Sequence, residues 1–129
     1  MQKALLDPNS DESKTIGVLL KRGRADLVLD RRQLSSELEI LAAPGETPGH
    51  KILKLSSKGQ VLYIVGDLFH NPLELEHLNW KSGEDPQANL TSKEKLIGSA
   101  LEEDALILAA HAKLGKLIRS ISGVKFQLV

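Results

Sequence analysis

Two short, almost wholly apolar runs constrain the fold of this chain more than any other feature. Residues 60–65 (QVLYIV) lead into Gly66 and Asp67, and residues 104–110 (DALILAA) lead into His111. A strand with one solvent-exposed face alternates polar and apolar side chains. Short apolar runs without alternation are therefore typical of strands buried on both faces of a sheet. The sequence therefore predicts a buried sheet, with a chemically active side chain at the end of two of its strands.

The other segments predict both helices and strands, so the fold class is α/β in the broad sense that includes α+β. A helix is expected over residues 9–22, capped by Asn9 or Ser10 and stopped by Gly23. A second helix is expected over 86–102, begun either by Asp85 with Pro86 or by Thr91 with Glu94. The remaining expected strands are residues 25–29, 38–43, 51–55, 116–120 and 124–129. Turn 56–59 makes a hairpin of 51–55 and 60–65, and the loop at 68–84 carries one helical turn at 73–76.

The composition excludes several classes of protein. The 129 residues suit a single domain over 1–129, and 17 basic against 17 acidic side chains argue against nucleic acid or an anionic membrane as partner. No apolar run approaches the roughly 20 residues of a membrane span. The chain has no cysteine, which removes disulfides and thiolate metal sites and fits a cytoplasmic location. Aromatic residues make up only 3%, too few for a surface that stacks nucleobases.

Three candidate metal ligands occupy similar positions in the predicted fold. The segment PGETPGH at 44–50 fixes an irregular loop that presents His50, while Asp67 and His111 each end a buried strand. Two imidazoles and a carboxylate suit Zn²⁺, with iron or manganese as alternatives. Separations of 17 and 44 residues exclude a local finger, so a sheet edge must gather the ligands.

The other histidines are open to two interpretations. His70 lies three residues after Asp67, where it could polarise a substrate oxygen or donate a proton as a catalytic group. A loop histidine bonded to backbone is an equally good interpretation of His70. His77, with glutamates beside it, is typical of a solvated helix face.

Local sequence around these residues resembles the metallo-β-lactamase superfamily, in its lactonase-like and organophosphate-hydrolase-like branch. APGETPGH at 43–50 is similar to the family's third metal-binding motif, VGDLFH at 65–70 to the next, and LILAAH at 106–111 to the last. The stretch 69–80, followed by Asp85 and Pro86, is similar to the same branch. The resemblance implies that His50, Asp67 and His111 are metal ligands, with Asp67 bridging two ions. It also implies the C-terminal half of an αββα sandwich, with a mixed, mostly antiparallel sheet and flanking helices.

Two departures from the family pattern affect the expected chemistry. The HxHxDH motif, which supplies the other ligands, does not occur in this chain, whose first histidine is His50. Glu46 stands where many relatives carry a histidine. The resemblance therefore implies an incomplete dinuclear site, with two protein ligands for each ion and zinc weakly bound or absent.

These considerations lead to two hypotheses for function and one for partners. The first is a truncated metallo-β-lactamase-fold hydrolase, metal-dependent and acting on esters, lactones or phosphoesters. The alternative is a non-catalytic remnant or interaction module. Half a sandwich leaves one apolar sheet face to be covered, so we expect a homodimer or a complementary N-terminal half as partner. The side chains expected on that face are of the type of Val61, Ile64, Leu106 and Leu108.

Overall fold

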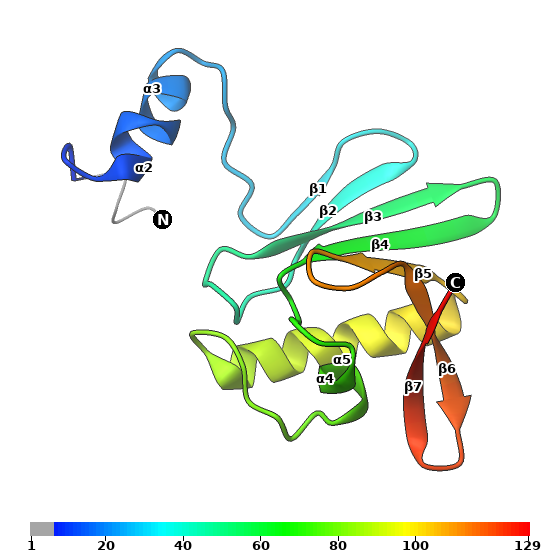
Figure 1. Ribbon diagram of the computed structural model, residues 1–129. Helices are drawn as coiled ribbons and strands as arrows, with labels where there is room; N and C mark the ends of the chain where they lie inside the picture. The colour runs from blue at the N-terminus through cyan, green and yellow to red at the C-terminus, as the bar shows by residue number, and fades with distance from the viewer. Residues whose placement is uncertain (1–6) are drawn as a thin grey trace.

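The computed structural model describes residues 7–129 as one seven-stranded sheet with helices, in the strand order β1-β2-β3-β4-β5-β6-β7 (Figure 1). The predicted α/β class, with a mixed and mostly antiparallel sheet, is confirmed. The strands are β1 Arg31–Gln33, β2 Leu38–Ala42, β3 Lys51–Ser57, β4 Gln60–Gly66, β5 Leu106–Ala109, β6 Gly115–Ser120 and β7 Gly123–Leu128. The helices are α2 Asp11–Lys14, α3 Ile16–Lys21, α4 Leu73–Glu76 and α5 Pro86–Glu102.

The N-terminal helical segment is interrupted, contrary to the continuous helix expected over 9–22. Ser10 caps α2 by accepting a hydrogen bond from the Ser13 backbone N–H, as expected. Thr15 then leaves the regular helix, with its hydroxyl donating to the Asp11 carbonyl oxygen at 2.6 Å. Such a bond from a β-branched residue competes with the helical ladder, and α3 begins one residue later. Gly23, at φ +63°, ends α3 as predicted.

The expected strand at 25–29 is wrong. This segment has no strand structure, and Leu27 and Leu29 are 46% and 70% exposed. The edge strand is instead β1, whose three residues are all exposed and pair antiparallel with β2. A short polar edge strand discourages pairing with other chains, and hydrophobic patterning does not reveal it.

The two predicted hairpins are confirmed, and one parallel pair joins them. Strands β3 and β4 turn through Lys58 and Gly59, both at positive φ, the geometry of a tight two-residue hairpin turn. Strands β6 and β7 pair antiparallel at the other end of the sheet. Strand β5 runs parallel to β4, so both strands end at the same edge.

Helix α5 covers one face of the sheet and encloses the core (Figure 1). Asp85 caps α5 through the backbone N–H groups of Gln87 and Ala88, as expected for a helix with Pro86 at its first position. The fully or almost fully buried apolar side chains include Ile52, Tyr63, Val65, Leu68, Phe69, Leu75, Leu96, Ala100, Ile107 and Leu117.

The opposite face of the sheet is apolar, and no helix within residues 7–129 covers it (Figure 1). Register pairs Leu38 with Leu55, Ile40 with Leu53, Leu55 with Leu62, Leu53 with Ile64, Leu62 with Leu106 and Ile64 with Leu108. Side chains alternate along a strand, so these aliphatic residues share one face, and none is classed as buried. We call them the outer face: Leu38, Ile40, Leu53, Leu55, Leu62, Ile64, Leu106 and Leu108. Val61, expected among them, packs instead against the core on the α5 side.

Within residues 7–129, no helix is both long and apolar enough to cross a membrane.

Candidate metal centre

The ends of the parallel pair β4 and β5 bring two predicted ligands together. Asp67 follows Gly66, the last residue of β4, and His111 lies two residues beyond β5. The Ala110 backbone N–H donates to the Gly66 carbonyl oxygen at 2.9 Å, which ties the two strand ends together. The Asp67 Oδ1 and His111 Nε2 atoms are 3.1 Å apart, and half of each side chain is exposed to solvent.

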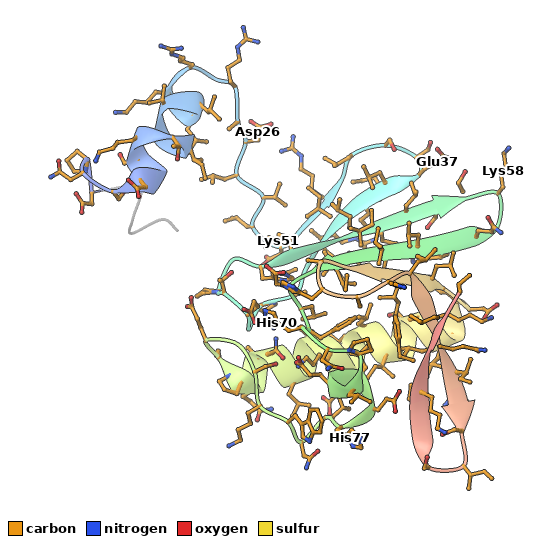
Figure 2. All side chains as sticks on the ribbon, in the orientation of Figure 1. Asp26, Glu37, Lys51, Lys58, His70 and His77 are labelled. Carbon is orange, nitrogen blue, oxygen red and sulfur yellow. The ribbon has the colours of Figure 1, made fainter. Side chains whose placement is uncertain are left out.

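His70 joins this pair. One ligand atom from each of Asp67, His70 and His111 lies within 4.8 Å of the others. The His70 and His111 rings are tilted by 31°, with centroids 4.8 Å apart. Figure 2 shows His70 at the end of the sheet marked by Lys51, opposite the Lys58 turn and apart from His77. His77 stacks on Trp80 instead, with ring centroids 5.0 Å apart.

His50 lies beside this cluster and is not one of its members. Its ring contacts Gly66, where a Cβ atom would come 3.3 Å from His50 Nε2. The His50 Nδ1 atom is 3.0 Å from the Ala43 carbonyl oxygen. Because a carbonyl oxygen only accepts hydrogen bonds, Nδ1 carries the proton and the Nε2 lone pair is left available. This is the arrangement usual for a histidine that binds a metal.

A buried ion pair between Glu74 and Lys93 fixes the loop that carries His70. The Glu74 Oε1 atom accepts the backbone N–H groups of His70 and Asn71, at 2.9 and 3.1 Å. Its Oε2 atom accepts Lys93 Nζ at 2.6 Å and the Ser82 hydroxyl at 2.8 Å. Burial raises the pKa of the Glu74 carboxyl, but these donors outweigh it, and the pKa falls to about 2. Glu74 is therefore an anion at neutral pH, and it holds the loop.

Sequence reasoning missed this pair, although a signal was present. Lys93 is only 1% exposed, on a helix whose buried face also includes Asn89, Leu96 and Ala100. Spacings of four, three and four residues place Lys93 in the middle of that face. A lysine there requires a buried acidic partner, and the nearby loop offers glutamates.

The backbone of the PGETPGH loop is set by close packing against the loop before α5. Gly83, at φ +83°, lies so near the Gly45 carbonyl oxygen that a Cβ atom would come within 2.4 Å of it. The Asp85 and Glu84 backbone N–H groups donate to the carbonyl oxygens of Gly45 and Glu46. The loop that presents His50 and Glu46 is thus held in place by the segment directly before α5.

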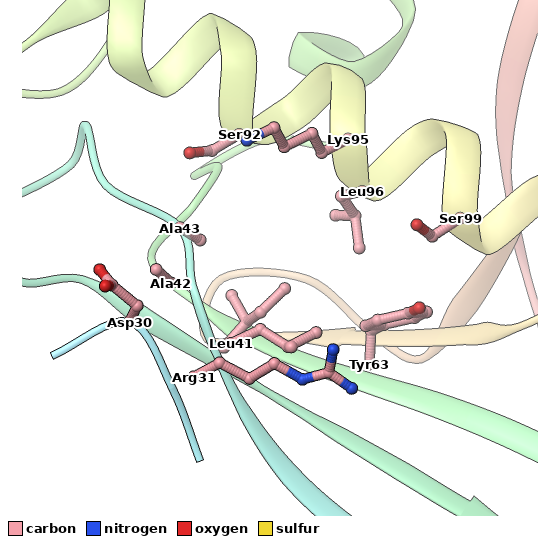
Figure 3. A pocket seen from close by; sticks show the side chains of 11 residues that line it. Asp30, Arg31, Leu41, Ala42, Ala43, Tyr63, Ser92, Lys95, Leu96 and Ser99 are labelled. Carbon is pink, nitrogen blue, oxygen red and sulfur yellow. The ribbon is translucent and has the colours of Figure 1, made fainter. Parts of the chain in front are cut away.

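A separate hollow of about 370 Å³ lies between α5 and strands β2 to β4. Figure 3 shows Leu41, Tyr63 and Leu96 facing it, with Arg31 and Lys95 also among its lining residues. Beside it the Tyr63 hydroxyl donates to Glu103, which also pairs with Lys54. Burial raises the pKa of the Glu103 carboxyl, but these two donors outweigh it and lower the pKa below its usual value. Neither Asp67 nor any histidine lines the hollow.

The donor set at the sheet edge fits a divalent cation of the zinc type. Two imidazoles and one carboxylate are ligands that such an ion accepts, and three protein ligands are usual where it is catalytic. The resemblance implied two protein ligands for each ion, because the HxHxDH motif is missing and His70 was not counted as a ligand. The structure gathers three donors in one place.

The fold is the partial metallo-β-lactamase fold expected from the motifs, as the similarity to solved structures shows. A scan against protein families and a search of curated proteins both find no match. Among solved structures, the chain resembles AidC, a dizinc quorum-quenching lactonase, with a TM-score of 0.71 and 22% identity over 98% of the chain and 47% of AidC.

Two further solved hydrolases support the same fold. The hydrolase AbOPH of the β-lactamase superfamily gives a TM-score of 0.71 and 17% identity, over 91% of this chain and 42% of that one. A probable metal-dependent hydrolase from Staphylococcus aureus gives 0.68 and 18%, over 84% and 41%. The chain thus spans less than half the length of each of these proteins.

Proposed function

We propose that this chain forms part of a metal-dependent hydrolase of the metallo-β-lactamase type, acting on an ester, a lactone or a phosphoester. The observation that carries the proposal is the convergence of Asp67 and His111, 3.1 Å apart, at the shared end of β4 and β5. His50 lies beside them with Nε2 available. The solved structures of the same fold, a dizinc lactonase among them, support the reaction class.

Zinc, with iron or manganese as alternatives, would be held by His50, Asp67 and His111. Such an ion, when bound, polarises a carbonyl or phosphoryl oxygen and makes water a stronger acid. The chain itself fixes the ligands: the Ala43 carbonyl orients His50, and the backbone bond between Ala110 and Gly66 aligns Asp67 with His111. All of these side chains have a solvent-exposed part, so a substrate has access.

A dinuclear site needs donors beyond those of this chain. The family pattern supplies them through an HxHxDH motif, and this sequence has none. The outer face of eight aliphatic side chains would require cover as well, since an exposed apolar surface of this kind marks an interaction site. We propose that a complementary half of the same fold covers the outer face and supplies the missing ligands, with a second copy of this chain as the competing partner.

Metal analysis and activity test this proposal together. Purified chain should contain zinc, iron or manganese, and His111→Ala and His50→Ala should each reduce the content. Lactone and phosphotriester hydrolysis should be weak for the chain alone. It should rise when a segment carrying HxHxDH is added. Metal-free protein whose stability does not change in either variant would favour the alternative, a non-catalytic interaction module that uses the outer face.

A further inference from the structure

Among residues 7–129, Glu46 has the one buried side-chain oxygen or nitrogen atom without a hydrogen-bond partner. Its Oε2 atom is buried and has no hydrogen-bond partner among residues 7–129. A buried carboxylate oxygen without a partner destabilises the fold, so an unsatisfied group of this kind calls for a functional explanation. By contrast, both oxygens of Glu74 accept hydrogen bonds.

The other oxygen of Glu46 faces His70. Glu46 Oε1 is 3.7 Å from His70 Nε2, too far for a formed hydrogen bond and close enough for a small movement to make one. The His70 backbone cannot shift freely, because its N–H donates to Glu74. His70 therefore lies within reach of Glu46 while also belonging to the cluster with Asp67 and His111.

A histidine that binds a metal through one ring nitrogen usually donates its other N–H to a carboxylate or a carbonyl oxygen. His50 already has such an acceptor in Ala43. We propose that Glu46 is the matching acceptor for His70, and that His70 is a metal ligand. With Asp67 and His111, it would complete a three-ligand site for one divalent cation held by this chain alone.

This inference rests on the proposed metal site and deepens it. It gives His70 the role of a ligand in place of the proton donor that the sequence suggested, and it makes Glu46 a positioning residue. The family pattern divides His50, Asp67 and His111 between two ions, with two ligands each. His70 raises the number of protein ligands for the ion at Asp67 and His111 from two to three, the number usual in catalytic zinc sites. Its consequence is that one cation binds before any partner is present.

Calorimetric titration of the metal-free chain with Zn²⁺ tests the inference, and Co²⁺ spectra report the coordination. We expect one ion per chain. Glu46→Ala should weaken its affinity about 10–100-fold, the usual effect of losing such an acceptor, and His70→Ala should weaken it at least as much. Glu46→Gln, which keeps a neutral acceptor, should fall between wild type and Glu46→Ala. His77→Ala and Glu94→Gln replace exposed residues outside the cluster and should bind as wild type does.

The stability of the metal-free protein distinguishes a positioning role of Glu46 from a purely structural role. Among residues 7–129 the Glu46 side chain makes no hydrogen bond and leaves a buried oxygen unsatisfied. Metal-free Glu46→Ala should therefore unfold at the same denaturant concentration as wild type or at a higher one. A fall in metal affinity without a fall in stability is the expected result.

If Asp67→Asn and His111→Ala abolish zinc binding while Glu46→Ala and His70→Ala do not, the inference is overturned and the proposed function stands. Zinc binding that appears only with a complementary half would also overturn the inference, and it would contradict the metal content expected above of the purified chain. Zinc binding in the expected pattern, without hydrolysis even with that half present, would count against the proposed function alone.

Discussion

Replacement of Lys93 by methionine should destabilise the protein by about 3 kcal/mol. The pKa of Glu74 falls from 4.5 to about 2 in the folded protein, and its side chain is only 10% exposed. At about 1.4 kcal/mol for each pH unit, this drop corresponds to roughly 3 kcal/mol of net stabilisation of the charged carboxylate by Lys93, the His70 backbone N–H and Ser82 together, with Lys93 the largest contributor. Removal of one partner from a buried ion pair costs about 3–5 kcal/mol in general, which agrees.

Urea unfolding at neutral pH, followed by circular dichroism, measures this loss. Lys95→Met is the matched control, because Lys95 is an exposed lysine on the same helix, and it should change the stability by less than about 0.5 kcal/mol. The reasoning would be refuted if Lys93→Met lost less than 1 kcal/mol, since the pair would then add little to the fold.

The same pair predicts the pH dependence of stability. Because the pKa of Glu74 is lowered in the folded state, its contribution is fully present above about pH 4.5. The contribution is lost as the pH falls from 4.5 to about 2. Glu74→Gln should therefore be less stable than wild type at neutral pH, and the difference should shrink over that acidic range. A constant difference between pH 7 and pH 2 would contradict the assignment.

Three further substitutions test other parts of the structure. Gly83→Ala should lower the free energy of unfolding in urea by at least about 1 kcal/mol, because Gly83 is at φ +83° and a Cβ would clash with Gly45. An unchanged free energy of unfolding would refute this contact. Tyr63→Phe should cost about 1.5–3 kcal/mol in the same assay through loss of the bond to Glu103, and a neutral result would show that water replaces it. Leu62→Lys on the outer face should reduce association with a complementary half or a second copy in analytical ultracentrifugation, whereas undiminished association would mean that another surface is used.

The sequence was sufficient for the elements whose signals are local. Turn residues located the β3–β4 hairpin, caps located α5, and the apolar runs located β4 and β5 with the ends that carry Asp67 and His111. The edge strand β1 was missed because its stability comes from backbone pairing with β2 and its side chains are exposed. An apolar pattern instead favoured residues 25–29, which lie against no neighbouring strand.

The composition of the site depended on contacts between distant segments. Asp67 and His111 were predictable because each ends a buried strand, and the side chains of parallel strands meet at one edge. The position of His70 was not predictable, because its loop is held by Glu74, and Glu74 is held in turn by Lys93 on α5, 19 residues further along the chain. Glu46 was noticed only as a departure from the family pattern, and its proximity to His70 is a property of the folded loop.

The parallel pairing of β4 with β5 also has a kinetic consequence. Leu62 pairs with Leu106 and Ile64 with Leu108, each 44 residues apart, whereas the other strand pairs join segments close in sequence. Contacts of such long range form late and slow the folding of a domain. Asp67 and His111 become neighbours only when this pair closes, so a bound cation should slow unfolding and leave the rate of refolding almost unchanged. The metal centre would then stabilise the completed sheet against unfolding and take no part in the nucleation of folding.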